Sequence, residues 1–359
     1  MELHDKLLEV SRLFRIEYEY LGYETIQMGN VNRTYKVNFM LPEGKPKSFL
    51  VQNVNTYAFR NPIGLMDNID QVTEHIRAKK PGQLALHFHH TADRKTYVID
   101  GNNFWRMTNF VPSVTFNSVS DMDILRNAGK AFGEFQRLLA DFPIDKLYET
   151  IPDFHNMELR ARQLREAVAK DPEGRCSEPE IRDFLSEIDL HIEEMCKAER
   201  LHREGILPKR ICHCDTKVSN MLFDKDGSVL CVIDLDTLMP SFIFSDVGDF
   251  LRTAANYVAE DCPEIDKVGF NMEIFRSFIR GYLESAGSFL TEVERENIPY
   301  AAALFPFMQA VRFLTDYING DTYYKIAYPE HNLVRTRNQM ALFRSVLSHM
   351  DQMKAIVSE

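Results

Sequence analysis

The sequence lacks the features of a membrane-spanning, secreted or nucleic-acid-binding protein. Its longest apolar run, Ala301 to Val311, is interrupted by Pro306 and Gln309 and is far too short to cross a bilayer. Residues 1–22 are charged and contain no continuous apolar core of the kind found in a signal peptide. Acidic side chains (53) outnumber basic ones (42), and the net charge of −11 argues against a nucleic-acid partner, because phosphate backbones require a basic surface. We therefore expect a cytoplasmic protein that binds neither membrane nor nucleic acid.

Cysteine is also scarce. The six cysteines are scattered along the chain without the spacing of a disulfide framework, so reduced thiols are expected. Separately, we expect a monomer or weak dimer. Cys212-His213-Cys214 lacks the second pair of ligands that a zinc site needs. The histidine-rich run at 87–90 is more typical of a solvated loop or strand end than of a metal site.

The length and composition favour two lobes in a soluble protein. The chain has 359 residues, of which 45% are hydrophobic and 26% charged. Residues 1–112 are predicted to form a lobe with a mixed β-sheet, and residues 113–359 a mainly helical lobe, which together give an α+β fold. In the first lobe we expect helices at 3–14 and 66–79 and strands at 23–28, 33–40, 48–53, 95–99 and 104–109.

The second lobe is predicted to carry a single strand pair among its helices. This hairpin joins 220–223 to 229–233 through a tight turn at 224–227. The expected helices lie at 121–140, 156–170, 179–204, 272–286, 290–316 and 334–357.

One short run carries the chemistry. Residues 213–220 read His-Cys-Asp-Thr-Lys-Val-Ser-Asn, and Asp234 follows directly after the predicted hairpin. Phosphoryl transfer requires a positioned hydroxyl, neutralisation of charge and metal ions that hold the phosphates. Asp215 can accept the proton of an acceptor hydroxyl, and Lys217 can face the γ-phosphate of ATP. Asn220 and Asp234 offer the hard oxygen ligands that Mg²⁺ prefers. The run predicts a kinase.

The order of these features resembles the protein-kinase-like phosphotransferases. A β-rich first lobe, a helical second lobe and H-x-D-x-K-x-x-N followed by a hairpin and an aspartate are similar to the aminoglycoside phosphotransferase family. The resemblance extends from about residue 25 to the C-terminus. It is closest to the branch that phosphorylates N-acetylhexosamines, and this closer match lies in residues 214–217, 233–240, 246–249, 312–317, 320–323 and 329–337.

The resemblance implies ATP, Mg²⁺ and a small sugar as the partners of this chain. It implies Asp215 as the catalytic base, Asn220 and Asp234 as Mg²⁺ ligands, and Asp236 as a further candidate ligand. Two more positions, Arg312 and Tyr323, match residues that contact the sugar in that branch.

Several roles stay open. Arg312 has the alternative of pairing with Asp316, four residues further along the helix. Arg335 and Arg337 could bind phosphate or sugar, or merely face solvent. Asn55 could contact substrate or nucleotide.

The first lobe departs from the wider kinase pattern in two ways. In place of a glycine-rich loop, the turn at Gly29 is followed by Asn30, Asn32 and Thr34, whose polar groups could cradle phosphates together with backbone N–H groups. In place of the strand lysine stands Gln52, and a neutral amide cannot neutralise phosphate charge. We therefore expect Lys217 and Mg²⁺ to carry more of that task.

Three further expectations concern the surroundings of the catalytic run. The backbone near Asn109 and Val111 is expected to pair with adenine. His213 is expected to pack beneath the catalytic loop, and Asp246 and Asp249 to anchor the backbone of that loop.

Two rival functions remain. The first is a kinase for another small alcohol, such as an aminoglycoside, choline or homoserine, but a cationic acceptor would require an acid-lined pocket and Arg312 argues against one. The second is a nucleotide-binding pseudokinase, which only the missing strand lysine favours.

Overall fold

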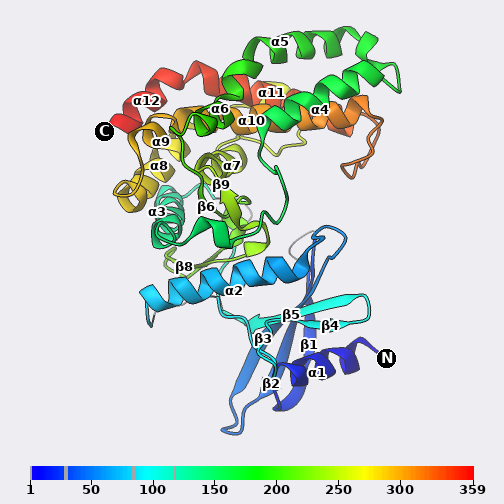
Figure 1. Ribbon diagram of the computed structural model, residues 1–359, viewed down its shortest axis with the longest axis vertical. Coiled ribbons are helices and arrows are strands. Elements are labelled where there is room, and N and C mark those ends of the chain that lie inside the picture. Colours follow the sequence, from blue (N-terminus) through cyan, green and yellow to red (C-terminus); the bar gives the residue numbers. More distant parts are fainter. Residues whose placement is uncertain (1, 28–30, 83–85, 117–118) are drawn as a thin grey trace.

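The computed structural model describes residues 2–27, 31–82, 86–116 and 119–359, and it consists of a β-rich lobe and a larger helical lobe (Figure 1). The bilobal α+β fold predicted from the sequence is confirmed. The N-terminus lies in the β-rich lobe and the C-terminus at the far side of the helical lobe. Within the described ranges, no helix is both long enough and apolar enough to cross a bilayer.

The first lobe is a five-stranded antiparallel sheet with a helix on each face. Its strand order is β1-β2-β3-β5-β4. The strands are β1 (Glu19–Ile26), β2 (Arg33–Met40), β3 (Pro46–Val54), β4 (Val98–Asp100) and β5 (Asn103–Asn109), and the helices are α1 (Leu3–Leu13) and α2 (Pro62–Lys79).

Side chains point alternately to the two faces of the sheet along each strand, and this alternation decides which residues pack against which helix. Val37, Val51 and Met107 point to one face and pack with α1 in a buried cluster. Val54 and Phe104 point to the opposite face and pack with α2. Strand residues whose side chains point to the same face as Val54 and Phe104 therefore face α2 and, beyond it, the helical lobe.

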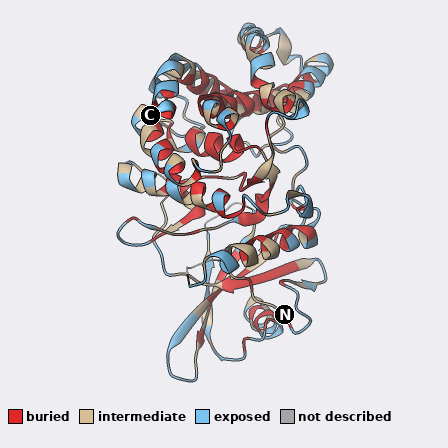
Figure 2. Ribbon diagram, turned by 60° about the vertical axis from the view of Figure 1, so that its left-hand side comes forward, coloured by how far each residue is buried: buried red, intermediate tan, exposed pale blue. Residues whose placement is uncertain are grey.

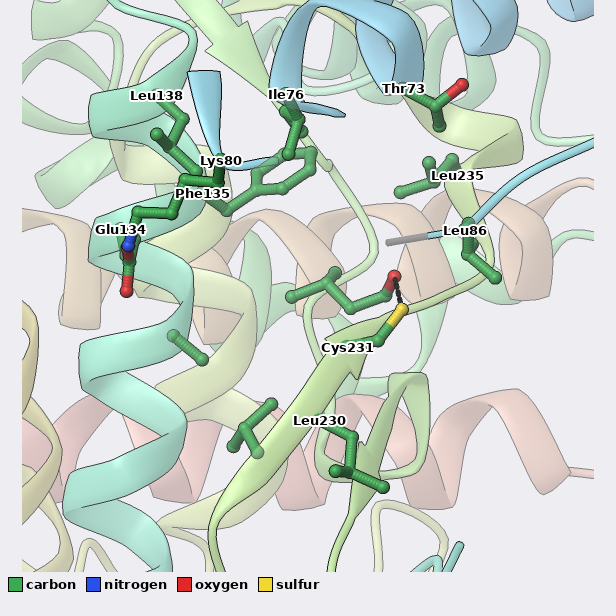
Figure 3. Close-up of a pocket in the computed structure, with 13 residues that line it drawn as sticks. Thr73, Ile76, Lys80, Leu86, Glu134, Phe135, Leu138, Leu230, Cys231 and Leu235 are labelled. Atoms are coloured by element: carbon green, nitrogen blue, oxygen red, sulfur yellow. Dashed lines mark hydrogen bonds and ion pairs between the residues drawn. The ribbon is translucent and has the colours of Figure 1, made fainter. Parts of the chain in front are cut away.

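A shared apolar cluster joins the two lobes. Ile69 and Val72 of α2 pack in one cluster with Phe135, Leu235 and Leu238 of the helical lobe. Figure 3 shows the pocket at this junction, lined by side chains of α2, α3 (Met122–Leu138) and β8 (Val229–Val232). The relative position of the lobes is thus set partly by burial of apolar surface.

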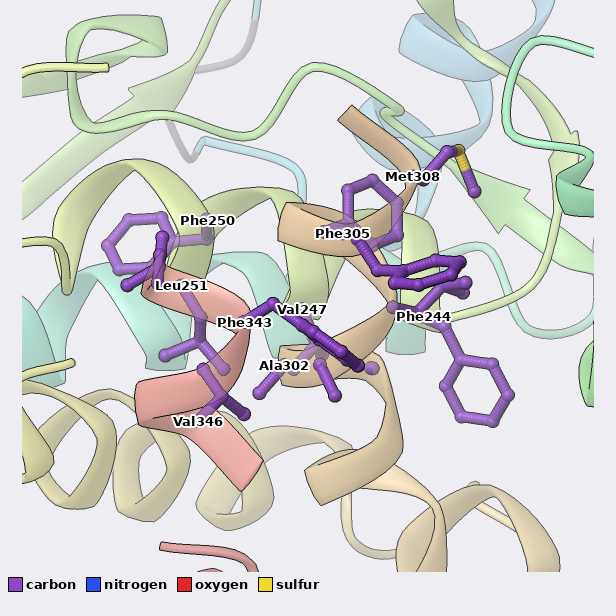
Figure 4. Close-up of a cluster of buried hydrophobic side chains, with 14 of the residues drawn as sticks. Phe244, Val247, Phe250, Leu251, Ala302, Phe305, Met308, Phe343 and Val346 are labelled. Carbon is purple, nitrogen blue, oxygen red and sulfur yellow. The ribbon is translucent and has the colours of Figure 1, made fainter. Parts of the chain in front are cut away.

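The second lobe is built around one almost wholly buried helix. In α10 (Ile298–Ile318) nearly every residue is buried, and its Phe305 and Met308 belong to the same buried cluster as Val247 of α7 (Phe244–Ala254) and Phe343 of α11 (His331–Ser348) (Figures 2 and 4). The helices are α3 (Met122–Leu138), α4 (Met157–Lys170), α5 (Pro179–Met195), α6 (Lys197–Arg203), α7 (Phe244–Ala254), α8 (Met272–Ala286), α9 (Glu292–Glu296), α10 (Ile298–Ile318), α11 (His331–Ser348) and α12 (Met350–Ser358).

Two expectations about this lobe are wrong. It contains a second strand pair, β6 (Arg210–Cys212) with β9 (Met239–Ser241), besides the predicted pair β7 (Met221–Phe223) and β8 (Val229–Val232). Three-residue strands give too little alternation to be recognised in a sequence. Helix α7 was also not predicted, because Ser245, Asp246 and Asp249 interrupt its apolar pattern, yet all three are buried.

Three predicted helices are each two helices in the structure. The expected spans at 179–204, 290–316 and 334–357 divide at Cys196, Asn297 and His349. Because the helical spacing of apolar residues continues across each break, the sequence pattern predicts one helix where the structure has two.

Glycines allow α3 and α8 to approach closely. A Cβ atom on Gly281 would lie 2.0 Å from the carbonyl oxygen of Arg126, and one on Gly129 would lie 2.1 Å from that of Phe278. Both contacts are with backbone, which cannot move without shifting a whole helix. The position of α3, which contacts the catalytic loop, therefore depends on these glycines.

We predict that Gly281→Ala destabilises the protein by roughly 2 kcal/mol or more, because the added methyl group overpacks a backbone contact. Thermal unfolding measures the effect. Lys130→Ala is the control, since Lys130 is an exposed residue of α3 whose ion pair with Glu284 is worth less than about 1 kcal/mol. Equal melting temperatures for Gly281→Ala and the wild type would contradict the prediction.

Candidate active site

The loop after β6 is held by one buried carboxylate. Asp246 of α7 is 1% exposed and accepts hydrogen bonds from the backbone N–H groups of His213 (3.1 Å) and Cys214 (2.9 Å). The side-chain amide of Gln136 in α3 donates to it as well (2.7 Å). Cys214 has a φ of 62°, a strained value for a residue with a side chain. These contacts confirm the anchoring role expected of Asp246, whereas Asp249 instead pairs with Arg252.

His213 connects the two loops that carry the catalytic candidates. Its ring is fully buried, and Nε2 donates to the carbonyl of Ile233 (2.8 Å) while Nδ1 accepts from the N–H of Asp215 (3.3 Å). The hydroxyl of Thr237 donates to the His213 carbonyl (2.7 Å). His213 has the structural position expected of it.

Asp215, Lys217 and Asn220 lie together, as their spacing predicted. The Lys217 ammonium is 3.0 Å from Oδ2 of Asp215, and the Asn220 amide donates to the same oxygen (3.1 Å) and to the Asp215 carbonyl (2.8 Å). Neither contact uses Oδ1 of Asp215. Desolvation lowers the pKa of Lys217, but the adjacent Asp215 carboxylate outweighs it and the net pKa is raised, so Lys217 remains cationic.

Asp234 follows β8 and lies beside Asn220. The backbone N–H of Ile233 donates to the carbonyl of Asn220 (2.9 Å), which brings the two candidate metal ligands onto neighbouring segments. Asp234 has a φ of 61°, so its backbone is also strained. Desolvation, followed by the charges of Asp236 and Asp215, raises the pKa of Asp234. A bound cation would relieve this repulsion.

Asp236 is bound to an arginine that the sequence reasoning missed. Arg106 of β5 forms a bidentate ion pair with Asp236, with Nη2 3.1 Å from Oδ2, and the two side chains are only 3% and 4% exposed. The amide of Asn32 donates to the same carboxylate (2.6 Å). The available signal was a lone charge in the apolar run Phe104 to Met107.

The other nucleotide candidates of the first lobe form polar contacts with one another. Gln52 donates to the hydroxyl of Thr34 (3.0 Å) and accepts from Nε of Arg106 (2.9 Å). Asn32 accepts from the N–H of Asn55 (3.0 Å). Asn30 lies outside the described residues.

The expected adenine-binding segment begins at Asn109, the last residue of β5. The carbonyl of Asn109 accepts from the hydroxyl of Thr108 (3.1 Å), and that of Val111 accepts from the hydroxyl of Ser113 (3.1 Å). The N–H of Phe110 is already bonded to the carbonyl of Ser48 (3.1 Å).

Arg312 lies among aromatic rings rather than against Asp316. Its guanidinium lies 5.7 Å from the ring centre of Phe154 and 5.6 Å from that of Tyr324, and it donates to Gln309 (3.1 Å).

Asp316 instead accepts hydrogen bonds from the backbone N–H groups of residues 322–324. Tyr323 lies on this loop and is 74% exposed.

Three arginines lie near His155 in the same region, and one of them, Arg252, is itself paired with Asp249 and Glu260. Its ring stacks on Phe154, which in turn packs against the catalytic loop near Cys214. Burial, then the charges of Arg312, Arg160 and Arg252, holds the pKa of His155 well below its usual value. Burial, then the charge of Arg312, lowers the pKa of Arg160 to about 10.

The sequence reasoning did not include these neighbours of Arg312, because they lie far apart along the chain. Arg160 donates to the carbonyls of Asp153 (3.2 Å) and Phe154 (2.7 Å) and to the side chain of Gln163 (3.0 Å), all at neutral acceptors. Arg312 and Arg160 therefore form a cationic and aromatic surface together with Phe154 and Tyr324, and both guanidinium groups donate to neutral acceptors.

No cluster of three or more His, Cys, Asp or Glu residues in the described ranges is arranged to hold a metal ion. Asn220 and Asp234 therefore do not amount to a complete protein cage. Mg²⁺ commonly takes only one or two protein ligands and completes its shell with phosphate oxygens and water.

The chain belongs to the phosphotransferase enzyme family, whose sequence pattern matches residues 24–292. Solved structures with a similar fold include an aminoglycoside phosphotransferase from Alicyclobacillus acidocaldarius, at 13% identity and a TM-score of 0.64, covering 98% of this chain and 96% of that one. A spectinomycin phosphotransferase in complex with ADP and spectinomycin is 14% identical (TM-score 0.58; 98% and 99% covered). Choline kinase from Cryptosporidium parvum is 13% identical (TM-score 0.58; 94% and 92% covered).

We predict that Asp246→Asn lowers both stability and kcat. An amide NH₂ cannot accept the hydrogen bonds that one carboxylate oxygen now accepts, and each buried donor left unpaired costs about 1–3 kcal/mol. We expect a lower melting temperature and a kcat reduced about 10-fold or more. Asp351→Asn, at an exposed position of α12, is the control. Wild-type stability and kcat in Asp246→Asn would show that this carboxylate does not hold the loop.

Proposed function

We propose that this phosphotransferase is an ATP- and Mg²⁺-dependent kinase that phosphorylates the anomeric hydroxyl of N-acetylhexosamines, N-acetylglucosamine or N-acetylgalactosamine, to give the sugar 1-phosphate. The observation that carries the choice of acceptor is the cationic and aromatic surface around Arg312. A neutral sugar is compatible with such a surface, whereas a positively charged acceptor would be repelled by it.

Asp215 is proposed as the base. Its Oδ2 is held by Lys217 and Asn220, and these contacts fix the orientation of the carboxylate while leaving Oδ1 for the acceptor hydroxyl. An anomeric hydroxyl is more acidic than an ordinary alcohol, so a carboxylate of ordinary basicity suffices. The proton passes to Asp215 as the oxygen attacks the γ-phosphorus in a loose transition state.

Asn220 and Asp234 are the proposed Mg²⁺ ligands. The Asn220 nitrogen is used by Asp215, so its amide oxygen is the atom available to a metal. The raised pKa of Asp234, caused by desolvation and by neighbouring carboxylates, indicates a site that gains from a cation. When bound, Mg²⁺ would neutralise phosphate charge and orient the phosphates. We do not include Asp236, because Arg106 and Asn32 occupy its oxygens.

The nucleotide is proposed to lie against the first lobe, with its phosphates toward Lys217. Thr34 and Gln52 lie on the face of the sheet that packs on α2, and Asn32 reaches Asp236 of the helical lobe. Asn30 is proposed from its position in the sequence, two residues before Asn32. Backbone groups of Asn109 and Val111 are proposed to pair with adenine. Because Gln52 is neutral, Lys217 is the side chain proposed to face the γ-phosphate.

On the acceptor side, Arg312 and Tyr323 are proposed to bind the sugar. The contacts of Arg312 with Phe154 and Tyr324 fix the plane of its guanidinium, which then presents remaining N–H groups to sugar oxygens. Tyr323 lies on a loop that Asp316 ties to α10. Its exposed ring can cover a sugar bound at Arg312.

We predict ADP release that depends on N-acetylglucosamine or N-acetylgalactosamine and is weak or absent with choline, ethanolamine or an aminoglycoside. A coupled assay with ATP and Mg²⁺ across this panel measures it. Turnover of a cationic acceptor in preference to both sugars would contradict the proposed acceptor while leaving phosphotransferase activity intact.

We predict that Asp215→Asn lowers kcat about 10²- to 10⁴-fold, because the amide cannot take the hydroxyl proton. ADP binding, measured by calorimetry, should remain close to that of the wild type. Asp224→Asn, in the exposed turn between β7 and β8, is the matched control and should retain activity. A kcat near the wild-type value in Asp215→Asn would remove Asp215 from the proposed role.

A further inference from the structure

A row of polar side chains crosses the first-lobe sheet. Thr34 lies directly opposite Gln52, and Gln52 directly opposite Arg106, so the three side chains share one face. Gln52 donates to Thr34 (3.0 Å) and accepts from Nε of Arg106 (2.9 Å). This face also packs on α2 and the helical lobe, so the row leads from the proposed nucleotide side into the junction between the lobes.

Arg106 ends this row by binding the helical lobe. Both terminal nitrogens of its guanidinium bind Asp236, and both side chains are almost fully buried. Desolvating two charges is costly, and a bidentate pair offsets the cost only in a well-defined geometry. The pair therefore fixes β5 relative to the segment that contains Asp236.

A second buried contact holds the same segment. Asn68 of α2 is fully buried and donates to the carbonyls of Leu238 (3.2 Å) and Tyr148 (2.9 Å). Thr237, between the two held residues, donates to the carbonyl of His213 in the catalytic loop (2.7 Å). Residues 236–238 are thus held by the first lobe on one side and by the catalytic loop on the other.

Asp234 lies just before this segment, and its backbone is strained. Its φ of 61° precedes the short 3-10 turn Leu235–Thr237, in which Asp236 lies. A strained conformation persists only where its surroundings determine it. Two polar side chains of the first lobe bind this turn, since Arg106 and Asn32 both donate to the Asp236 carboxylate.

We propose that Arg106 is a positioning residue of the phosphoryl-transfer site: through Asp236 it fixes Asp234, and it connects Thr34 and Gln52 to the metal-binding end of the site. The inference rests on the proposed function and adds a residue to it. β5 thereby supplies a cation directly opposite Gln52, the position at which β3 carries a neutral amide. The charge of Arg106 is neutralised by Asp236, and all three nitrogens of its guanidinium are hydrogen-bonded within the protein. Arg106 therefore positions protein groups, and Lys217 remains the cation proposed to face the phosphate.

The test removes the pair without leaving an unpaired charge. In Arg106→Met/Asp236→Leu both partners are apolar, an exchange that buried ion pairs often tolerate. Binding of Mn²⁺ in the presence of ADP, followed by electron paramagnetic resonance, reports on the metal site without turnover. We expect the Mn²⁺ dissociation constant to rise about 10-fold, within the range for lost supporting contacts of a metal ligand.

Two further variants keep the result interpretable. Arg106→Lys retains a charge but cannot bind both Asp236 oxygens and Gln52 together, so its Mn²⁺ affinity should be intermediate. Arg344→Met/Glu187→Leu removes a bidentate pair between α5 and α11 and should leave Mn²⁺ binding unchanged. Melting temperatures of all variants show how much of each effect is loss of stability.

Wild-type Mn²⁺ affinity in both Arg106 variants would overturn the positioning role while the proposed function stands. Equal weakening in the Arg344/Glu187 control would overturn it too, because the effect would then be a general loss of stability. Failure of the wild-type protein to bind Mn²⁺ with ADP would instead overturn the proposed function, and the inference with it.

Discussion

The site depends on one buried carboxylate, that of Asp246, which accepts hydrogen bonds from backbone N–H groups of the catalytic loop. Asp246 lies under the loop that carries Asp215 and binds two consecutive N–H groups of it, one of them at the strained residue Cys214. A buried carboxylate is costly unless its oxygens are satisfied, so the loop has little freedom to depart from this geometry. The catalytic loop is thus held from within the helical lobe, through α7 and α3.

The segment after Asp234 is held in a complementary way, from the first lobe. Arg106 and Asn68 reach it from β5 and α2, and His213 and Thr237 tie it to the catalytic loop. The two candidate metal ligands are therefore fixed by opposite sides of the molecule.

Much of this arrangement could be predicted from local sequence. The bilobal fold followed from strand alternation in the first third of the chain and helical spacing in the rest, and the grouping of Asp215, Lys217 and Asn220 followed from a motif contained in a few residues. Helix α7 and the β6–β9 pair were missed, because the former is interrupted by buried acidic residues and the latter is very short. Arg106 was missed for a different reason, since its partner Asp236 lies 130 residues away.

The acceptor side shows the same limit. Arg312 was singled out by resemblance, but its surroundings come from α4, the segment before it and the loop after α10. No spacing within the sequence brings Phe154, Arg160 and Tyr324 together. The structure adds the charge of this surface, which is the physical argument for a neutral acceptor.

The central claim is that the phosphoryl group is transferred to the anomeric oxygen of an N-acetylhexosamine. The most direct measurement is two-dimensional ¹H–³¹P NMR of the product formed from N-acetylglucosamine or N-acetylgalactosamine with ATP and Mg²⁺. The account predicts a phosphorus correlation to the anomeric proton alone. A correlation to a proton of any other carbon, or no phosphorylated product from either sugar, would contradict it.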